Sequence, residues 1–171
     1  LFSHCIILFN SIFALLQQSG LAKENYSFIE TQNNGEYSGI INEDIGLKGN
    51  VNAKLKKINE KLNVGRSSIT TEIVKNCYSL LRSAIELLVE QDIFKMVVKR
   101  YQRNIALSYF INVNGKLIDE KKEELNTLFE RCCGYIDAHS NPDFIDNDPT
   151  FDDIDSDLKK FKEIYNAFNQ K

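Results

Sequence analysis

The chain has 171 residues and a net charge of −3, and 43% of its residues are hydrophobic and 26% charged. These values are ordinary for a globular chain and suffice for one domain or the second half of a two-domain protein. The small net charge does not indicate a protein that holds nucleic acid through its overall field, although local contact with phosphate is compatible with it. The apolar stretch at residues 5–16 is shorter than the roughly 18 residues that a membrane span requires, so we expect no membrane contact.

The first strand and helix signals lie close to the start of the chain. Residues 1–4 have the pattern of a strand end, and residues 8–19 have that of a helix. Gly20 is suited to end this helix because glycine adopts the left-handed conformation without strain. We therefore expect a strand that leads directly into a helix.

A β-hairpin is predicted next. Residues 26–31 and 37–41 are strand-like and flank Asn33-Asn34-Gly35. Asn and Gly tolerate the positive φ values that tight hairpin turns require. The strands of the chain should therefore be confined to residues 1–45.

The pattern after residue 50 is helical. The clearest helix spans residues 71–89, where apolar residues recur at steps of three and four. We expect it at the centre of a helical module, with Leu81, Ala84 and Leu88 buried, and we expect a turn at Asn114-Gly115. Further helices are predicted at residues 52–62, 93–98, 119–135 and 154–168. The fold class is thus mainly α, with a boundary between residues 1–48 and residues 49–171.

The cysteines and aspartates of the chain match no metal motif. The four cysteines contain no C-x-x-C pair, so we expect reduced thiols in a cytoplasmic protein. A calcium-binding loop that began at Asp153 would need Gly at position 158 and Glu at position 164, where the chain has Leu158 and Ile164. No metal site is therefore predicted.

Arg82, Glu86 and His139 are the candidate catalytic residues. Arg82 and Glu86 are four residues apart, so they share one face of the predicted helix. Glu and His perform acid–base chemistry, and Arg holds phosphate through its fork of donors. These residue types suit metal-independent RNA cleavage, in which the ribose 2′-OH attacks the phosphate. The alternative is a surface ion pair with a structural histidine nearby.

Several segments, in order along the chain, resemble one family of proteins. They are Ser3-His4, Phe9-Asn10-Ser11-Ile12, the hairpin at Asn33-Asn34-Gly35, the stretch of residues 77–86 that contains Arg82 and Glu86, Val97-Val98-Lys99-Arg100-Tyr101, and Arg131-Cys132-Cys133 followed by His139. The family is the bacterial SMC/ABC-like AAA ATPases of phage-defence and restriction-linked systems, which include the anticodon nucleases. In those nucleases an Arg-x-x-x-Glu pair and a later His form the catalytic triad.

The resemblance implies an ATP site to which this chain contributes one residue, while the rest of the site lies upstream. Residues 1–48 would be the end of an ATPase head that forms a homodimer, and His4 would be the switch histidine that contacts the γ-phosphate. The chain contains no G-x-x-x-x-G-K-[ST] motif, and phosphate affinity comes mainly from that loop. We therefore expect an upstream head and a chain that alone binds ATP weakly or not at all.

Two functions follow from the resemblance, beside a third reading in which the module is only a stabilising extension of the head. In the first, the helical module is the regulatory or partner-docking tail of a defence-type ATPase, and it contacts the head or a separate nuclease subunit. In the second, it is a tRNA anticodon nuclease that uses Arg82, Glu86 and His139. Only the second requires these three side chains to meet in one cleft.

Overall fold

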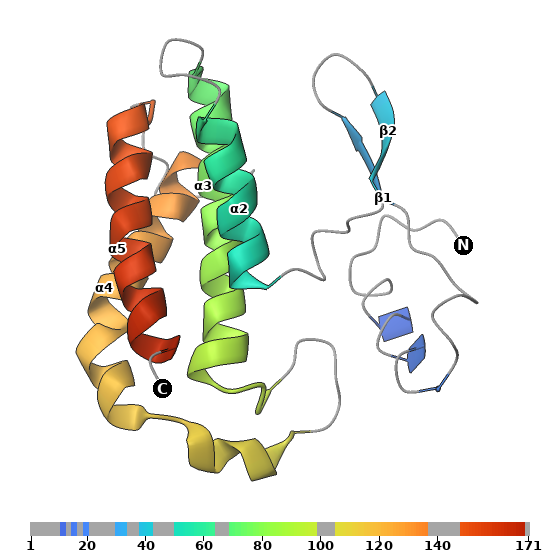
Figure 1. Cartoon of the computed structure of the whole chain (residues 1–171), viewed down its shortest axis with the longest axis vertical. Helices are drawn as coiled ribbons and strands as arrows, with labels where there is room; N and C mark the ends of the chain where they lie inside the picture. The colour runs from blue at the N-terminus through green and yellow to red at the C-terminus, as the bar shows by residue number, and fades with distance from the viewer. Residues whose placement is uncertain are drawn as a thin grey trace. The chain divides into compact units, whose positions relative to one another are not determined.

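The computed structural model describes residues 11–12, 15–16, 19–20, 30–33, 38–42, 50–63, 69–98, 105–136 and 148–169. The chain divides into two compact units (Figure 1). The first comprises residues 1–49 and 98–106, and the second comprises residues 50–97 and 107–171.

The first unit contains a two-stranded antiparallel sheet. Its strands are β1 (Glu30–Asn33) and β2 (Ser38–Asn42), and the pairing shifts register between Gln32 and Asn33. Asn33 therefore belongs to the first strand, whereas the sequence pattern placed it in the turn. Asparagine has low strand propensity, but the pairing of Asn33 with Ser38 of β2 outweighs that preference.

The predicted first helix is partly covered by the described residues. Residues 11, 12, 15 and 16 are helical, and Gly20 has a φ of 69°. This left-handed conformation is the one expected of a residue that ends a helix. The predicted strand end at residues 1–4 lies outside the described residues.

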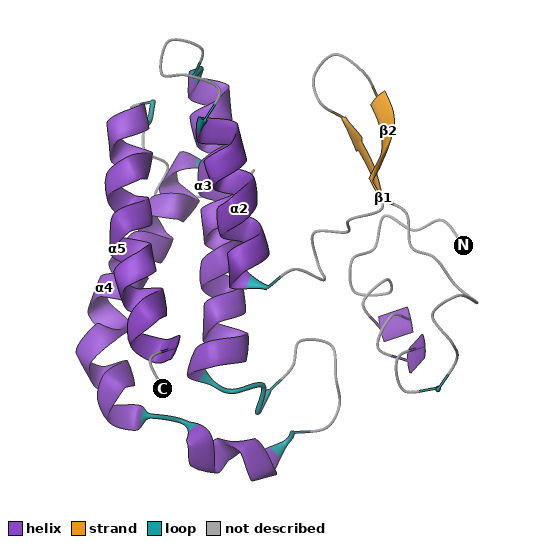
Figure 2. Cartoon of the chain, viewed as in Figure 1, coloured by secondary structure: helices purple, strands orange, loops and turns teal. Residues whose placement is uncertain are grey.

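The second unit is a bundle of helices built around α3, which packs against the other three long helices (Figure 1). Figure 2 shows that its described residues are helices joined by loops. The predicted mainly α fold is confirmed. The long helices are α2 (Val51–Leu62), α3 (Thr71–Leu87), α4 (Gly115–Tyr135) and α5 (Phe151–Asn169).

The core forms because α3 places apolar residues at helical spacing along one broad face. Leu81, Ala84 and Leu88 are fully buried, as predicted. Phe161 and Ile164 of α5 are also fully buried and belong to the same cluster. An apolar side chain of this size stabilises the fold by about 1.5–3 kcal/mol when it leaves water.

Polar side chains define where the helices begin. The Asn50 Oδ1 atom accepts a hydrogen bond of 2.9 Å from the Ala53 N–H, which starts α2. At the start of α5, the Thr150 N–H donates to Asp153 Oδ2 over 2.8 Å, and the Asp153 N–H donates back to Thr150 Oγ1 over 3.3 Å. Such reciprocal caps satisfy amide groups that the first turn leaves without a partner.

The predicted turn at Asn114-Gly115 is instead the start of α4. Asn114 Oδ1 accepts a hydrogen bond of 3.1 Å from the Leu117 N–H. The same short amide that favours turns also favours helix caps, so the dipeptide alone does not separate the two structures. A 3-10 helix, η5 (Leu107–Asn112), precedes α4 and contains no buried residue.

The predicted short helix at residues 93–98 is wrong. The chain continues from α3 as a π-helix, η4 (Leu88–Ile93), and then turns. Lys95 and Met96 have φ values of 49° and 60°, and this left-handed backbone cannot continue a right-handed helix. The Met96 N–H donates to the Glu90 carbonyl over 2.8 Å and closes the turn.

Among the residues that the structure describes, no helix combines the length and apolar character needed to cross a membrane.

Candidate functional site

The structure brings Arg82 and Glu86 together on one face of α3. Arg82 Nε lies 3.3 Å from Glu86 Oε1, and both side chains remain about one-third exposed, at 39% and 34%. The Arg82 guanidinium carbon also lies 5.5 Å from the centre of the Phe129 ring on α4. The guanidinium is thus held by a carboxylate and an aromatic face, which is an arrangement that joins α3 to α4.

The two histidines that the sequence predicts as site residues, His139 and His4, lie outside the described residues. Of the proposed catalytic triad, the structure therefore relates only Arg82 and Glu86. The described residues also include none of those that the resemblance assigns to ATP. In the described part of the chain, no group of three His, Cys, Asp or Glu residues is arranged to hold a metal ion.

A buried polar network that the sequence analysis missed connects three helices. Asp157 of α5 is only 1% exposed. Its Oδ2 accepts a hydrogen bond of 2.9 Å from the Tyr78 hydroxyl on α3, and its Oδ1 accepts one of 3.0 Å from Arg131 Nη1 on α4. Burial, followed by the Asp157 charge, raises the pKa of Tyr78, so the phenol remains a donor.

A signal for this network was present in the sequence. Asp157 occupies the apolar face of α5, between Ile154 and Phe161, where a charge is costly unless it has partners. A charged residue at a core position predicts a buried partner of opposite charge or a donor. The sequence does not identify that partner, because Tyr78 is 79 positions away.

Burial disfavours the reactive form of two cysteines. Cys77 and Cys132 are reduced and fully buried. Burial raises the pKa of the Cys77 thiol from 9.0 to about 11, and it also raises the pKa of Cys132. The thiolate is the nucleophilic form, so neither residue is a nucleophile at neutral pH.

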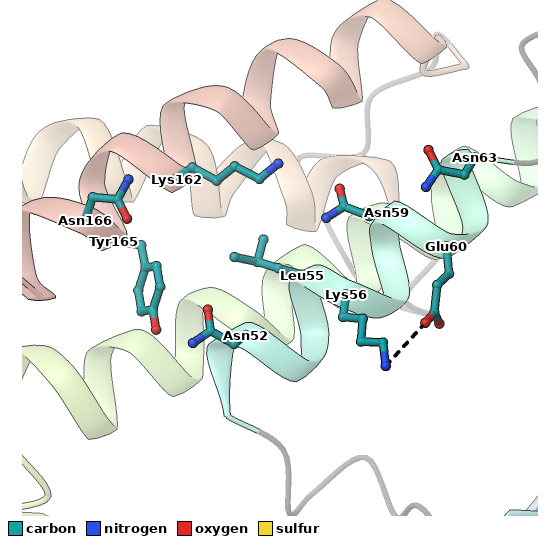
Figure 3. A pocket seen from close by; sticks show the side chains of 9 residues that line it. All are labelled: Asn52, Leu55, Lys56, Asn59, Glu60, Asn63, Lys162, Tyr165 and Asn166. Carbon is teal, nitrogen blue, oxygen red and sulfur yellow. Dashed lines mark ion pairs between the residues drawn. The ribbon is translucent and has the colours of Figure 1, made fainter.

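A groove of about 540 Å³ lies between α2 and α5 (Figure 3). Leu55 forms an apolar part of its lining, the Tyr165 ring extends from α5 toward Asn52, and the Lys162 side chain extends toward Asn59. Both helices belong to the second unit, so the groove lies within a single body. The lining residues are Asn52, Leu55, Lys56, Asn59, Glu60, Asn63, Lys162, Tyr165 and Asn166.

The groove is distinguished by polar groups that the fold does not use. Four of its nine lining residues are asparagines, and their side-chain amides make no hydrogen bond with the described residues. Lys162 likewise makes no ion pair within the described part of the chain. Lys56 does have a partner, because its Nζ lies 3.8 Å from Glu60 Oε1. The groove therefore offers donors and acceptors to a molecule from outside.

A smaller pocket of about 280 Å³ lies over the buried network and is lined by residues of α4 and α5. Arg131 and Asp157, which line it, already bond to each other. Glu124, a third lining residue, is paired with Lys121 over 3.1 Å. Lys160 of this lining makes no ion pair within the described part of the chain, but the pocket has no counterpart to the four asparagine amides of the groove.

An exposed apolar strip lies on η5. Leu107, Phe110 and Ile111 are 71%, 59% and 87% exposed. None of them contributes to the core of the bundle.

Comparisons of the chain with protein-family models, with curated proteins and with solved structures give no match.

Proposed function

We propose that the helical unit is a non-catalytic docking module that binds another protein in the groove between α2 and α5. This is the role of a regulatory or partner-docking tail in a defence-type ATPase, whose partner would be the ATPase head or a separate nuclease subunit. The observation that carries the proposal is the set of four asparagine amides that make no hydrogen bond with the described residues. These amides lie on facing helices and do not contribute hydrogen bonds to the fold, so they can bind a partner.

Helix propensity at Asn59 supports a role outside folding. Asn59 lies within α2, where asparagine is less favourable than alanine by roughly 0.5 kcal/mol or more. At this exposed position Lys, Glu or Gln would stabilise the helix better, so the asparagine is explained by recognition rather than by stability.

A selection experiment tests this function although the partner is unidentified. The intact chain is immobilised and challenged with a phage-displayed library of random peptides. Peptides that bind the groove should lose affinity by about tenfold in Asn59→Ala and Asn166→Ala, because each substitution removes one or two hydrogen bonds of about 1 kcal/mol each.

Asn76→Ala is the matched control. Asn76 is an exposed asparagine within α3 and lines neither described pocket, so this substitution should leave binding unchanged. A library that yields no peptide sensitive to Asn59→Ala or Asn166→Ala would contradict the docking function.

A second candidate, a metal-independent tRNA nuclease, is favoured by the contact between Arg82 and Glu86 at 3.3 Å. In it, Glu86 or His139 would remove the proton of the 2′-OH, and Arg82 would hold the phosphate. Its test is cleavage of bulk tRNA in EDTA by the intact protein and by Glu86→Gln. Gln keeps the shape of Glu but cannot accept the proton, so unchanged cleavage by this variant would eliminate the triad.

A further inference from the structure

We infer that the occupant of the groove between α2 and α5 is an acidic peptide in extended conformation, whose backbone is held by the asparagine amides. This inference rests on the proposed docking function and specifies its ligand. It starts from the chemistry of the amide side chain, which carries one carbonyl acceptor and an NH2 donor. A peptide unit carries the complementary acceptor and donor, so an asparagine can bind the N–H and the C=O of a backbone at once.

The spacing of the polar side chains suits an extended backbone. Asn59 and Asn63 on one wall are four residues apart, as are Lys162 and Asn166 on the other. Four residues of helix rise by about 6 Å. In an extended chain, the N–H and C=O groups of every second residue point to the same side, at intervals of about 6.8 Å. Neighbouring backbone groups on one side of the ligand can therefore bond to neighbouring polar side chains of one wall.

A helical ligand would not use these amides. Its backbone N–H and C=O groups bond within the helix, and such ligands enter grooves through apolar side chains. In this groove Leu55 is an apolar residue among eight polar or aromatic neighbours. The lining thus favours a ligand whose backbone is accessible.

The charges of the lining select an acidic ligand. The groove contains two lysines and one glutamate. Glu60 is paired with Lys56, whereas the Lys162 ammonium extends into the groove and makes no ion pair within the described part of the chain (Figure 3). An aspartate or glutamate of the ligand would complete this pair. A basic ligand would place a like charge beside Lys162.

The same features disfavour single-stranded RNA. A nucleic acid brings one negative charge per nucleotide and needs several cations along its path. It also needs exposed aromatic faces on which bases stack. The lining contains one aromatic residue, Tyr165, and its ring is stacked on Phe161 with the ring centres 6.4 Å apart, so the groove offers one aromatic face at most.

The test extends the peptide selection to the chemistry of the ligand. The helix α2 has 12 residues and is about 18 Å long, which accommodates about five extended residues, so random peptides of about ten residues are long enough. We expect the selected peptides to be rich in Asp and Glu. N-methylation of their backbone should weaken binding at every second residue, by about tenfold at each sensitive position.

Reversing the charge of Lys162 tests the predicted charge of the ligand most directly. Lys162→Glu should change the selected peptides from acidic to basic, whereas Lys122→Glu on α4, outside both described pockets, should not. An oligouridylate of similar length serves as the nucleic-acid probe. Binding of this RNA that is lost in Asn59→Ala would overturn the inference.

The outcomes separate the ligand from the function. Groove-dependent peptides that are basic, or that show no alternation in the N-methyl scan, would overturn the extended acidic ligand and leave the docking function intact. The absence of any groove-dependent peptide would overturn both.

Discussion

Asp157 and Asn59 are polar residues on helices of the same bundle, but the fold uses them in opposite ways. Asp157 is buried, and both of its carboxylate oxygens accept hydrogen bonds, from Tyr78 and Arg131. Asn59 lies on the groove wall, and its amide makes no hydrogen bond with the described residues. A polar group that is bonded inside the core joins helices, whereas an exposed one that makes no hydrogen bond with the described residues remains available to a ligand.

This contrast predicts that substitutions at the two regions change stability in opposite directions. The largest effect is expected for Asp157→Ala, which removes the carboxylate and leaves the buried Tyr78 hydroxyl without its acceptor. We expect the free energy of unfolding to fall by about 3–5 kcal/mol in urea denaturation. Asp155→Ala is the control, because Asp155 pairs with Lys159 at the surface and should cost less than about 0.5 kcal/mol. Equal effects of the two substitutions would remove the distinction between core and surface.

The buried thiol predicts a loss of stability at alkaline pH. The pKa of Cys77 is raised from 9.0 to about 11 in the folded chain, so the folded state retains a proton that the unfolded state releases. The buried thiol makes its full contribution to the free energy of unfolding below about pH 9. As the pH rises toward 11 this contribution is lost, and the free energy of unfolding falls by about 2 kcal/mol. Cys77→Val should make the fall shallower. An identical alkaline slope in this variant would show that Cys77 does not contribute.

A finer test of the buried network is Tyr78→Phe. Phe keeps the ring, whose centre lies 4.7 Å from that of Tyr135, and removes only the hydroxyl that donates to Asp157. We expect a loss of about 1–2 kcal/mol in the free energy of unfolding, because one buried hydrogen bond to a charged group disappears. A double-mutant cycle with Asp157→Ala should give a coupling energy of similar size, and additive effects would show that the bond contributes nothing.

The smallest effect has the opposite sign. Asn59→Ala should raise the free energy of unfolding by about 0.5 kcal/mol, because alanine is the better helix former and no hydrogen bond is lost. Thermal melts of this variant and of Asn76→Ala should shift upward together. A clear destabilisation by Asn59→Ala would show that this amide stabilises the fold, as Asp157 does.

Local patterns were sufficient for much of the fold. The spacing of apolar residues predicted the central helix and the burial of Leu81, Ala84 and Leu88, because helical periodicity depends only on neighbouring positions. The same reasoning was wrong at residues 93–98, where left-handed residues Lys95 and Met96 end the helix. Nothing in those two residue types indicates a positive φ, since the surrounding structure imposes it.

The candidate sites divide in the same way. The sequence by itself determined that Arg82 and Glu86 share a helix face, since a spacing of four residues places them there in any α-helix. Only the tertiary structure decided that Asp157 meets Tyr78 and Arg131, and that asparagines of α2 face Lys162 and Asn166 of α5 across a groove. These pairs come from helices far apart along the chain, and their meeting depends on how the helices pack against α3, a long-range outcome that no local spacing encodes.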